Sequence, residues 1–465
     1  MGTFEIIMYF ILPAIVLLII VTVPLLKRRK PKKEIASDET LNTIYEAFGE
    51  KDNILSIRRT QDRINFTVKD VKQIKNNVLK ELNISAFLKQ NEVTILFKNG
   101  SKNLYDYVKT KLKEWLFLKI YEDLMNLKGV AGNEKLVRDY FVNFIKNYKN
   151  FEIRFDNLGS VFAVKKSKNK DAKTLMIAGH MDEVGFMVSS ITKNGHLKLQ
   201  PLGGFKPEVL LSQVLDLTLD NGLVVSGVIG SLPPHIKEAN KTKITDLLFD
   251  IGLESKEEAV KLGVKPGQMV TFQANYTKTL NPNRIISKAV DNRFGCGLAL
   301  EAIKEFNDKD LDINLVVGAT VQEEVGLRGA KTSVNMFKPD MFIALDASPV
   351  DDLVKTENGA LGEGFLLRLF DPRNTMLSGI RKYFVNLASK ENIKYQPFTS
   401  LGGTDAARAL DQLDGVLATT IGLPARYIHS SAAMMDIRDV LEAKKMLFAI
   451  VNDLNEEVIK LIKEG

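Results

Sequence analysis

The chain has 465 residues, enough for two to four domains, and its 45% hydrophobic and 26% charged residues are typical of globular proteins. Its single cysteine, Cys296, excludes an intrachain disulfide and suits a reducing compartment. The formal net charge is +7, but six of the positive charges lie between Lys27 and Lys33, so the rest of the chain is nearly neutral. A nucleic-acid-binding protein would carry its basic excess on a folded face, so we expect no nucleic-acid partner.

The chain opens with an uncharged apolar segment. Residues 6–26 are long enough to cross a hydrocarbon core of about 30 Å. No positive stretch precedes them and no small-residue cleavage site comes after them, which argues against a signal peptide. The positive residues after the segment place the remainder of the chain on the cytoplasmic side. We therefore expect a transmembrane helix over residues 4–26, a basic linker over 27–37, and a single-pass protein of the cell membrane with its main part in the cytoplasm.

Residues 38–118 predict a small α+β domain with helices on one face of an antiparallel sheet. The helical and extended patterns alternate, with a turn inside each extended region. In chain order we expect a helix, two strands, an amphipathic helix, a hairpin and a closing helix over residues 38–49, 53–68, 70–82, 86–98 and 103–118.

Part of this small domain resembles the glucose-type enzyme IIB domain of the sugar phosphotransferase system. The resemblance is carried by "GEKDNILSIRRTQDRINFTVKDV", and that family has a phosphorylated cysteine in a C-x-T-R-hydrophobic-R pattern. Here Thr60 takes the place of the cysteine and Asn65 that of the second arginine. A threonine hydroxyl is not a nucleophile near neutral pH unless a base activates it, and no histidine lies in this stretch. We expect a docking, spacer or sensing domain that has lost phosphoryl transfer.

From residue 119 onward, apolar runs alternate with helical patterns, which predicts an α/β sheet with parallel strands. Several of these runs end in residues that can bind metal ions. Because ligands bind beyond the carboxyl ends of parallel strands, we expect these side chains to converge. The residues are His180, Asp182, Glu323, Glu324, Asp346 and His429, together with Asp291 at the start of an amphipathic helix.

Carboxylates crowded together repel one another and lose hydration, unless cations balance their charge. Imidazole and carboxylate ligands suit zinc, with cobalt and manganese as alternatives. A pair of ions about 3.5–4 Å apart needs a bridging carboxylate, and a further carboxylate can act as a general base. Neighbouring residues at a strand end point in different directions. One of Glu323 and Glu324 can therefore be a ligand and the other a base.

Eight motifs give residues 119–465 a resemblance to the dinuclear-metal aminopeptidase family that includes the glutamyl aminopeptidases and the tetrahedral aminopeptidases. All eight occur in the family's order. They are "AGHMDEVGF", "GVIGSLPPH", "DIGLESKEEAVKLGVKPGQ", "SKAVDNRFGC", "EEVGLRGA", "ALDAS", "GGTDA" and "ARYIHSS".

The resemblance implies a role for each of these side chains. His180 and Asp346 would hold one metal, Glu324 and His429 the other, and Asp291 would bridge them. Glu323 would be the general base, and Asp182 would orient the imidazole of His180. Asp405, in "GGTDA", lies near the site in the family, without a role that the resemblance defines.

The implied reaction is hydrolysis of N-terminal residues from cytoplasmic peptides by a hydroxide held between two metal ions, zinc or cobalt before manganese. The implied fold is a mixed sheet flanked by helices, with a small β-barrel-like domain inserted. Residues 119–187 and 282–465 would form the catalytic domain, and 188–281 the insert. Relatives often form hollow dodecamers, so we expect a homo-oligomer; the N-terminal additions leave a dimer as the alternative.

Two other functions compete with this one. The chain could be a scaffold or regulatory protein of sugar uptake that retains a non-catalytic peptidase module. The complete ligand set argues against this, because an inactive module usually loses a ligand or the base. A related amidohydrolase acting on another acylated amine would share the site and differ in its pocket.

Overall fold

The computed structural model describes residues 37–97, 100–230, 243–354 and 358–465. The chain divides into two compact units, Met1–Leu118 and Lys119–Gly465. Each unit has its own hydrophobic core.

The expected transmembrane helix over 4–26 and nearly all of the basic linker lie outside the described residues. Within the described ranges, no helix is both long enough and apolar enough to cross a membrane. The longest helix there, α6 (Ser101–Asn126), has 26 residues, and charged side chains recur along it. The prediction of a single-pass protein of the cell membrane is corrected on this finding.

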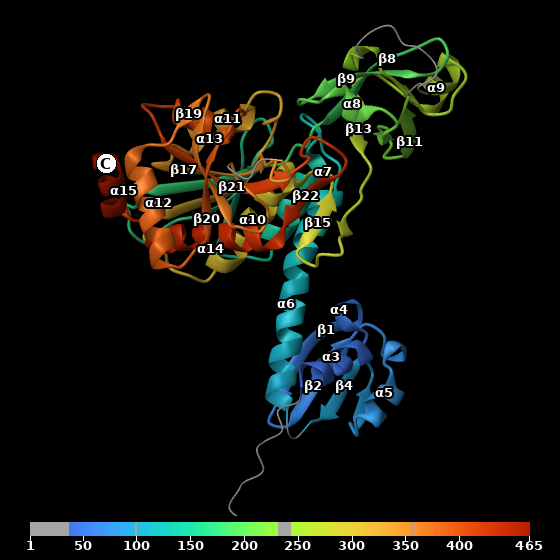
Figure 1. Cartoon of the computed structure of the whole chain (residues 1–465), viewed down its shortest axis with the longest axis vertical. Coiled ribbons are helices and arrows are strands. Elements are labelled where there is room, and N and C mark those ends of the chain that lie inside the picture. The colour runs from blue at the N-terminus through green and yellow to red at the C-terminus, as the bar shows by residue number, and fades with distance from the viewer. Residues whose placement is uncertain (1–36, 98–99, 231–242, 355–357) are drawn as a thin grey trace, which may run out of the picture. The chain divides into compact units, whose positions relative to one another are not determined.

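The first unit contains a four-stranded antiparallel sheet in the order β1-β2-β4-β3. Leu41, Leu79 and Leu104, one from each of three helices, join the sheet residues Phe66 and Val93 in one core, so the helices cover one face (Figure 1). The elements have the order that the sequence pattern indicates. They are α3 (Asp38–Ala47), α4 (Glu50–Asn53), β1 (Ile54–Thr60), β2 (Arg63–Val68), the 3-10 turn η2 (Val71–Gln73), α5 (Asn76–Glu81), β3 (Ala86–Lys89), β4 (Glu92–Leu96) and α6.

The second unit is built on a 12-stranded mixed sheet. Its longest path has the order β14-β15-β22-β21-β17-β7-β16-β6-β5, and β18, β19 and β20 extend it beside β21. The strands are β5 (Glu152–Phe155), β6 (Val161–Lys165), β7 (Thr174–His180), β14 (Thr277–Lys278), β15 (Arg284–Ser287), β16 (Asn314–Thr320), β17 (Met341–Pro349), β18 (Phe365–Asp371), β19 (Asn374–Thr375), β20 (Tyr395–Thr399), β21 (Leu417–Arg426) and β22 (Ala433–Asp436).

The centre of this sheet consists of the parallel strands β21, β17, β7 and β16. They are nearly continuous apolar runs because helices cover both faces (Figure 1). α10 packs on one face with α7 and α14 beside it, and α11 and α13 pack on the other. The helices are α7 (Lys135–Ile145), α10 (Val290–Phe306), α11 (Arg328–Phe337), α12 (Ser378–Lys390), α13 (Asp405–Leu410), α14 (Ile437–Asp453) and α15 (Glu456–Glu464).

A closed six-stranded barrel is inserted between β7 and β14, in the order β10-β11-β12-β9-β8-β13. Its first strand begins at Gly185, three residues before the expected start of the insert, and Thr277–Lys278 already pairs in the large sheet. The elements are β8 (Gly185–Ile191), β9 (Leu197–Leu202), α8 (Pro207–Leu210), β10 (Val214–Thr218), β11 (Val224–Ile229), the 3-10 turn η3 (Ile244–Asp246), β12 (Leu248–Asp250), α9 (Lys256–Leu262) and β13 (Met269–Phe272). Apolar residues such as Phe186, Leu217 and Phe249 fill it.

Candidate metal centre and active site

The predicted site residues lie together at the carboxyl edge of the central parallel strands. His180 is the last residue of β7, and Thr320, at the end of β16, is its partner in the ladder. The period of two in a strand puts His180 on the face shared by Met176 and Ala178, and Asp346 on the face shared by Phe342 and Ala344. The remaining side chains arrive from the segments after β16 and β21 and from the first turn of α10.

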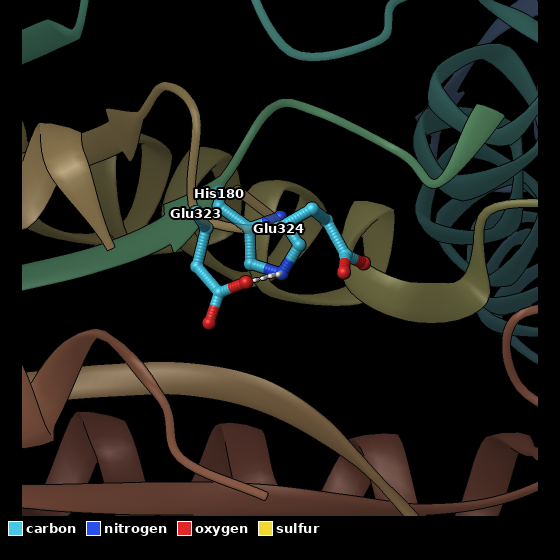
Figure 2. A group of neighbouring side chains, drawn as sticks. All are labelled: His180, Glu323 and Glu324. Carbon is cyan, nitrogen blue, oxygen red and sulfur yellow. Dashed lines mark ion pairs between the residues drawn. The ribbon is translucent and has the colours of Figure 1, made fainter. Parts of the chain in front are cut away.

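The imidazole of His180 is the centre of a first group. Its Nε2 atom lies 3.2 Å from Asp291 Oδ1, 3.6 Å from Asp346 Oδ1 and 3.8 Å from Glu323 Oε2. Figure 2 shows Glu323 and Glu324 on different sides of this ring, with the Glu323 carboxylate directed at it. His180 is 2% exposed and Asp346 5%, so the group is shielded from water.

A second group forms around His429. Its Nε2 atom lies 3.5 Å from Asp291 Oδ2 and 3.6 Å from Glu324 Oε1. The two oxygens of Asp291 therefore face the two histidines, one each. Ligand atoms in the sets His180–Asp291–Asp346, Asp291–Glu324–His429 and His180–Glu323–Glu324 lie within 4.8 Å of one another.

Both histidines are held through their Nδ1 atoms. His180 Nδ1 lies 2.9 Å from the main-chain oxygen of Asp182, and His429 Nδ1 lies 2.8 Å from that of Gly204. Because a carbonyl oxygen only accepts, each Nδ1 donates, so the neutral form of each imidazole carries its lone pair on Nε2, the atom that faces the carboxylates. This is the tautomer that a metal-binding histidine needs.

The carboxylate of Asp182 makes contacts that the sequence did not indicate. Its Oδ1 atom is 3.6 Å from His180 Nδ1, farther than the main-chain oxygen. Instead, Oδ1 accepts from the N–H of Glu323 at 3.0 Å, and Oδ2 accepts from the N–H of Glu324 at 3.1 Å. Asp182, which is fully buried, therefore holds the backbone of both glutamates.

Burial and mutual repulsion oppose ionisation of the adjacent glutamates. Burial raises the pKa of Glu324 to about 8, and the charge of Asp291 adds to that rise. Burial also raises the pKa of Glu323 well above its usual range, against the attraction of His180. Burial opposes ionisation of Asp291 as well, but its interactions with His180 and His429 hold its pKa below the usual range.

The donor set fits divalent cations. Asp291 Oδ1 and Glu324 Oε1 are buried and accept no hydrogen bond from the residues that the structure describes. Buried oxygens without donors are rare in proteins, because each carries a desolvation cost. Imidazole nitrogen and carboxylate oxygen are zinc, cobalt and manganese ligands. The site could therefore hold metal ions between His180, Asp291 and Asp346 and between Asp291, Glu324 and His429.

Sequence reasoning missed a buried ion cluster behind the site. Glu183 accepts from Lys288 Nζ at 2.6 Å and 2.7 Å, and Arg293 Nη2 lies 3.4 Å from it. Arg293 also donates to the main-chain oxygen of Met181 at 2.9 Å. Lys288 and Arg293 are 0% exposed. A signal was present, because all three charges lie within three residues of His180 or Asp291, in the motifs that carry these candidate ligands.

Asp405 lies at the start of α13, on the face of the sheet that carries His180 and Asp346. Its Oδ2 atom accepts from the Thr320 hydroxyl at 2.5 Å, and the residue is 3% exposed. Burial raises its pKa to about 7. The structure therefore places Asp405 beside the site, as the motif suggested, and binds it to the strand that precedes Glu323.

Comparison with known proteins identifies relatives for the second unit. Residues 159–446 match the family described as M42 glutamyl aminopeptidase. The chain is 41% identical over 345 residues to the glutamyl aminopeptidase of Lactococcus lactis subsp. cremoris (strain MG1363), which covers 73% of this chain and 97% of that protein.

Solved structures of aminopeptidases are also similar to the second unit. The TET aminopeptidase from Thaumarchaeota archaeon SCGC AB-539-E09 superposes with a TM-score of 0.71 at 32% identity, over 74% of this chain and 99% of that one. The Pyrococcus horikoshii TET1 peptidase, which can assemble into a tetrahedron or a large octahedral shell, gives 0.67 at 28% identity, over 73% and 100%. These structures support the α/β peptidase fold with its barrel.

These matches give no support to the resemblance between residues 38–118 and enzyme IIB domains. They do assign the second unit, because the family match spans more than half of the chain and the Lactococcus enzyme aligns over nearly its whole length. The chain therefore belongs to the M42 family of aminopeptidases, hydrolases that act on peptides.

Proposed function

We propose that this aminopeptidase is metal-dependent and uses two divalent ions, with Glu323 as its general base. The observation that carries the proposal is the position of Asp291 between two imidazoles, each within 3.5 Å of a different oxygen of the same carboxylate. A site for one metal ion, at either His180 or His429, would not require a carboxylate that reaches both histidines.

His180 and Asp346 would hold one ion, Glu324 and His429 the other, and Asp291 both. Zinc or cobalt fit this set best, with manganese as an alternative. When bound, the ions supply Lewis acidity and lower the pKa of water. The Nδ1 hydrogen bonds to the main-chain oxygens of Asp182 and Gly204 hold each imidazole in the orientation in which its Nε2 atom can bind a metal ion.

Glu323 would take the proton from the attacking water and deliver it to the leaving amine nitrogen. Its side chain faces the same space as the ligands, and its exposure is 8%. Asp182 accepts a hydrogen bond from the main-chain N–H of Glu323. This contact fixes the backbone position of Glu323 and so limits the positions that the Glu323 carboxylate can take. Asp182 would thus serve the base more directly than it serves the imidazole.

For the released residue we propose an acidic side chain. The Lactococcus relative is named a glutamyl aminopeptidase. Arg368, 6% exposed, donates to the Ser348 hydroxyl at 2.6 Å, two residues along β17 from Asp346. Its charge lowers the pKa of Asp346 against the effect of burial, so it acts on the site. Arg368 Nη1 lies 3.7 Å from Asp371 Oδ2, but its Nε has no acceptor among the described residues, which leaves a donor for a substrate carboxylate.

We further propose a catalytic domain and an inserted domain divided near the expected bounds 187/188 and 281/282, with all of β8 (Gly185–Ile191) in the insert and β14 (Thr277–Lys278) in the catalytic domain. We also propose that the protein is a homo-oligomer. The assembly of the Pyrococcus horikoshii peptidase into closed shells supports the last point. For residues 38–118 we propose docking rather than phosphoryl transfer. Thr60 is exposed at the β1–β2 turn, and the only histidines of the chain lie beyond residue 179.

The test uses the full chain, stripped with a chelator and reloaded with zinc, cobalt or manganese. Glutamyl, leucyl and lysyl chromogenic substrates are assayed with each metal, and bound metal is measured in parallel. Restored cleavage, greatest for the glutamyl substrate, is expected. Absence of cleavage with two bound ions per chain would favour the scaffold function or a non-peptide amide substrate. Cleavage that survives complete metal removal would exclude the proposed mechanism.

A further inference from the structure

Three consecutive main-chain N–H groups donate to buried carboxylates where β16 ends. Glu323 and Glu324 donate to the two oxygens of Asp182. Gln322 donates to Glu134 Oε1 at 3.1 Å. The segment that carries the proposed base is therefore held at each of its first three residues, by two different side chains.

Glu134 is buried and its carboxylate lies within hydrogen-bond reach of the Gln322 N–H. It is 6% exposed, and its Oε1 atom also accepts from the N–H of Gly132 at 3.0 Å. Glu134 is the N-cap residue just before α7, but its side chain makes no capping hydrogen bond to that helix. Its carboxylate instead joins its own loop to Gln322, which is 188 residues away in the chain.

Gln322 needs such a partner. Its φ angle is +55°, in the left-handed region that side chains other than glycine rarely adopt. This conformation sets the direction in which the chain leaves β16, and so the position from which the Glu323 side chain begins. A hydrogen bond to the N–H of Gln322 stabilises the strained conformation over an extended one.

The segment after β16 borders a cavity on the Glu134 side. A cavity of about 750 Å³ is lined there by Val321, Gln322, Glu134, Leu136, Arg138 and Gln268. Arg328 holds Gln322 through two other atoms, because its N–H donates to the main-chain oxygen of Gln322 at 3.2 Å and its Nη1 donates to the Gln322 side chain at 2.9 Å. The N–H of Gln322 is held by Glu134.

We propose that Glu134 is a positioning residue for the general base, acting by holding Gln322 in its left-handed conformation. The proposal rests on the function proposed above for Glu323. Geometry, and not charge, is the operative property: an oxygen must stand within hydrogen-bond reach of the Gly132 and Gln322 amides at once. Among the described residues, Glu134 accepts from the N–H groups of Gly132 and Gln322 and forms no hydrogen bond or ion pair with a candidate metal ligand.

Two variants separate geometry from charge. Glu134→Gln removes the charge and keeps an oxygen at the same reach, whereas Glu134→Asp keeps the charge and withdraws the oxygens by one methylene. We expect E134Q to retain nearly wild-type kcat. We expect E134D to lose kcat by between about tenfold and a hundredfold, with KM little changed and the full metal content, because the base is displaced and the ligands are not.

Asp340→Ala is the matched control. Asp340 Oδ2 accepts from the N–H of Thr174 at 2.8 Å, at the opposite ends of the strands that carry His180 and Asp346. The D340A variant loses a carboxylate–backbone hydrogen bond comparable to the one between Glu134 and Gln322. Its thermal stability should therefore fall while its kcat stays unchanged. If E134D behaves in the same way, Glu134 has only a structural role and the proposal is wrong.

Glu323→Gln in the same series keeps the two proposals distinguishable. Near-normal turnover by E323Q would remove Glu323 as the base, whatever the Glu134 variants do. An inactive E323Q together with a fully active E134D would overturn the positioning role alone. An inactive E134Q with an active E134D would show that charge is what matters, and would also overturn it.

Discussion

The two units of this chain differ in whether their buried polar side chains have hydrogen-bond partners. In the first unit, the described buried polar side chains are Asn53 and Ser101, and both form hydrogen bonds to the main chain. At the sheet edge of the second unit, Asp291 Oδ1 and Glu324 Oε1 are buried and accept no hydrogen bond from the described residues, although each faces an imidazole. Buried polar groups with partners stabilise a fold, whereas carboxylate oxygens buried without donors beside two imidazoles indicate an ion-binding site.

The largest expected effect comes from the shared carboxylate. Replacing Asp291 with alanine removes a ligand from both proposed ions. Because partners outside the coordination shell already contribute about ten- to a hundredfold in metal affinity, a shared ligand should contribute at least as much to each ion. We expect loss of both metals and of activity, measured by metal analysis and peptide hydrolysis.

Asp308→Ala is the control for that variant, since Asp308 is exposed just beyond the other end of α10. It should keep its metals and its activity. If D291A kept two ions per chain, Asp291 would not be the bridge, and its unpaired oxygen would need another explanation.

Glu323→Gln should have the next largest effect. The glutamine keeps the shape of the side chain and its main-chain bond to Asp182, but it cannot take a proton. We expect kcat to fall by about 10²- to 10⁴-fold, the usual range for loss of a general base, with both metals still bound. Calorimetric metal titration and steady-state kinetics on the same preparation test both halves of this prediction.

The stability of the second unit should depend on pH, because its buried site contains groups with raised pKa values. Burial opposes protonation of His429, but Asp291 and Glu324 raise its pKa to about 9, and burial raises the pKa of Glu324 to about 8. Both groups bind protons more tightly folded than unfolded. Their stabilising contribution is complete below the unfolded pKa of each group and is lost as pH rises through the folded values.

Chelated protein should therefore lose stability in its second unit as pH rises from about 4.5, the ordinary pKa of a glutamate, to about 9, the raised pKa of His429. Metal binding requires the deprotonated forms and should strengthen over the same range. The difference in Tm between metal-loaded and chelated protein should widen with pH, as scanning calorimetry can measure. A difference that narrows would contradict the assignment of Glu324 and His429 as ligands.

Much of this site could be anticipated from local sequence. Apolar runs such as Leu315–Ala319 predict buried parallel strands, and parallel strands bring their carboxyl ends to one edge. That is why His180 and Asp346, distant in the chain, could be expected to meet. The period of two within each strand then limits which side chains face the site.

The supporting contacts could not be anticipated in this way. Glu134 and Gln322 are 188 residues apart, and Asp182 and Glu323 are 141 apart. Neither pair has a periodicity that marks it, because a hydrogen bond to a main-chain N–H requires no particular partner residue.

The smallest expected effect on activity comes from the first unit. Asn53 is fully buried; its amide donates to the oxygens of Phe48 and Asp70 at 2.9 Å and 3.0 Å, and its Oδ1 accepts from the N–H of Asp70 at 2.8 Å. Asn53→Ala leaves these groups unpaired and should destabilise this unit by about 1–3 kcal/mol. Asn65→Ala, which removes one half-buried bond to Thr94, should cost less. Native-state hydrogen exchange of amides in the first unit measures both, and peptide hydrolysis should be unchanged in each. A loss of hydrolysis in N53A at temperatures where the first unit is still folded would mean that this unit contributes to catalysis, and the contrast between a structural unit and a catalytic one would fail.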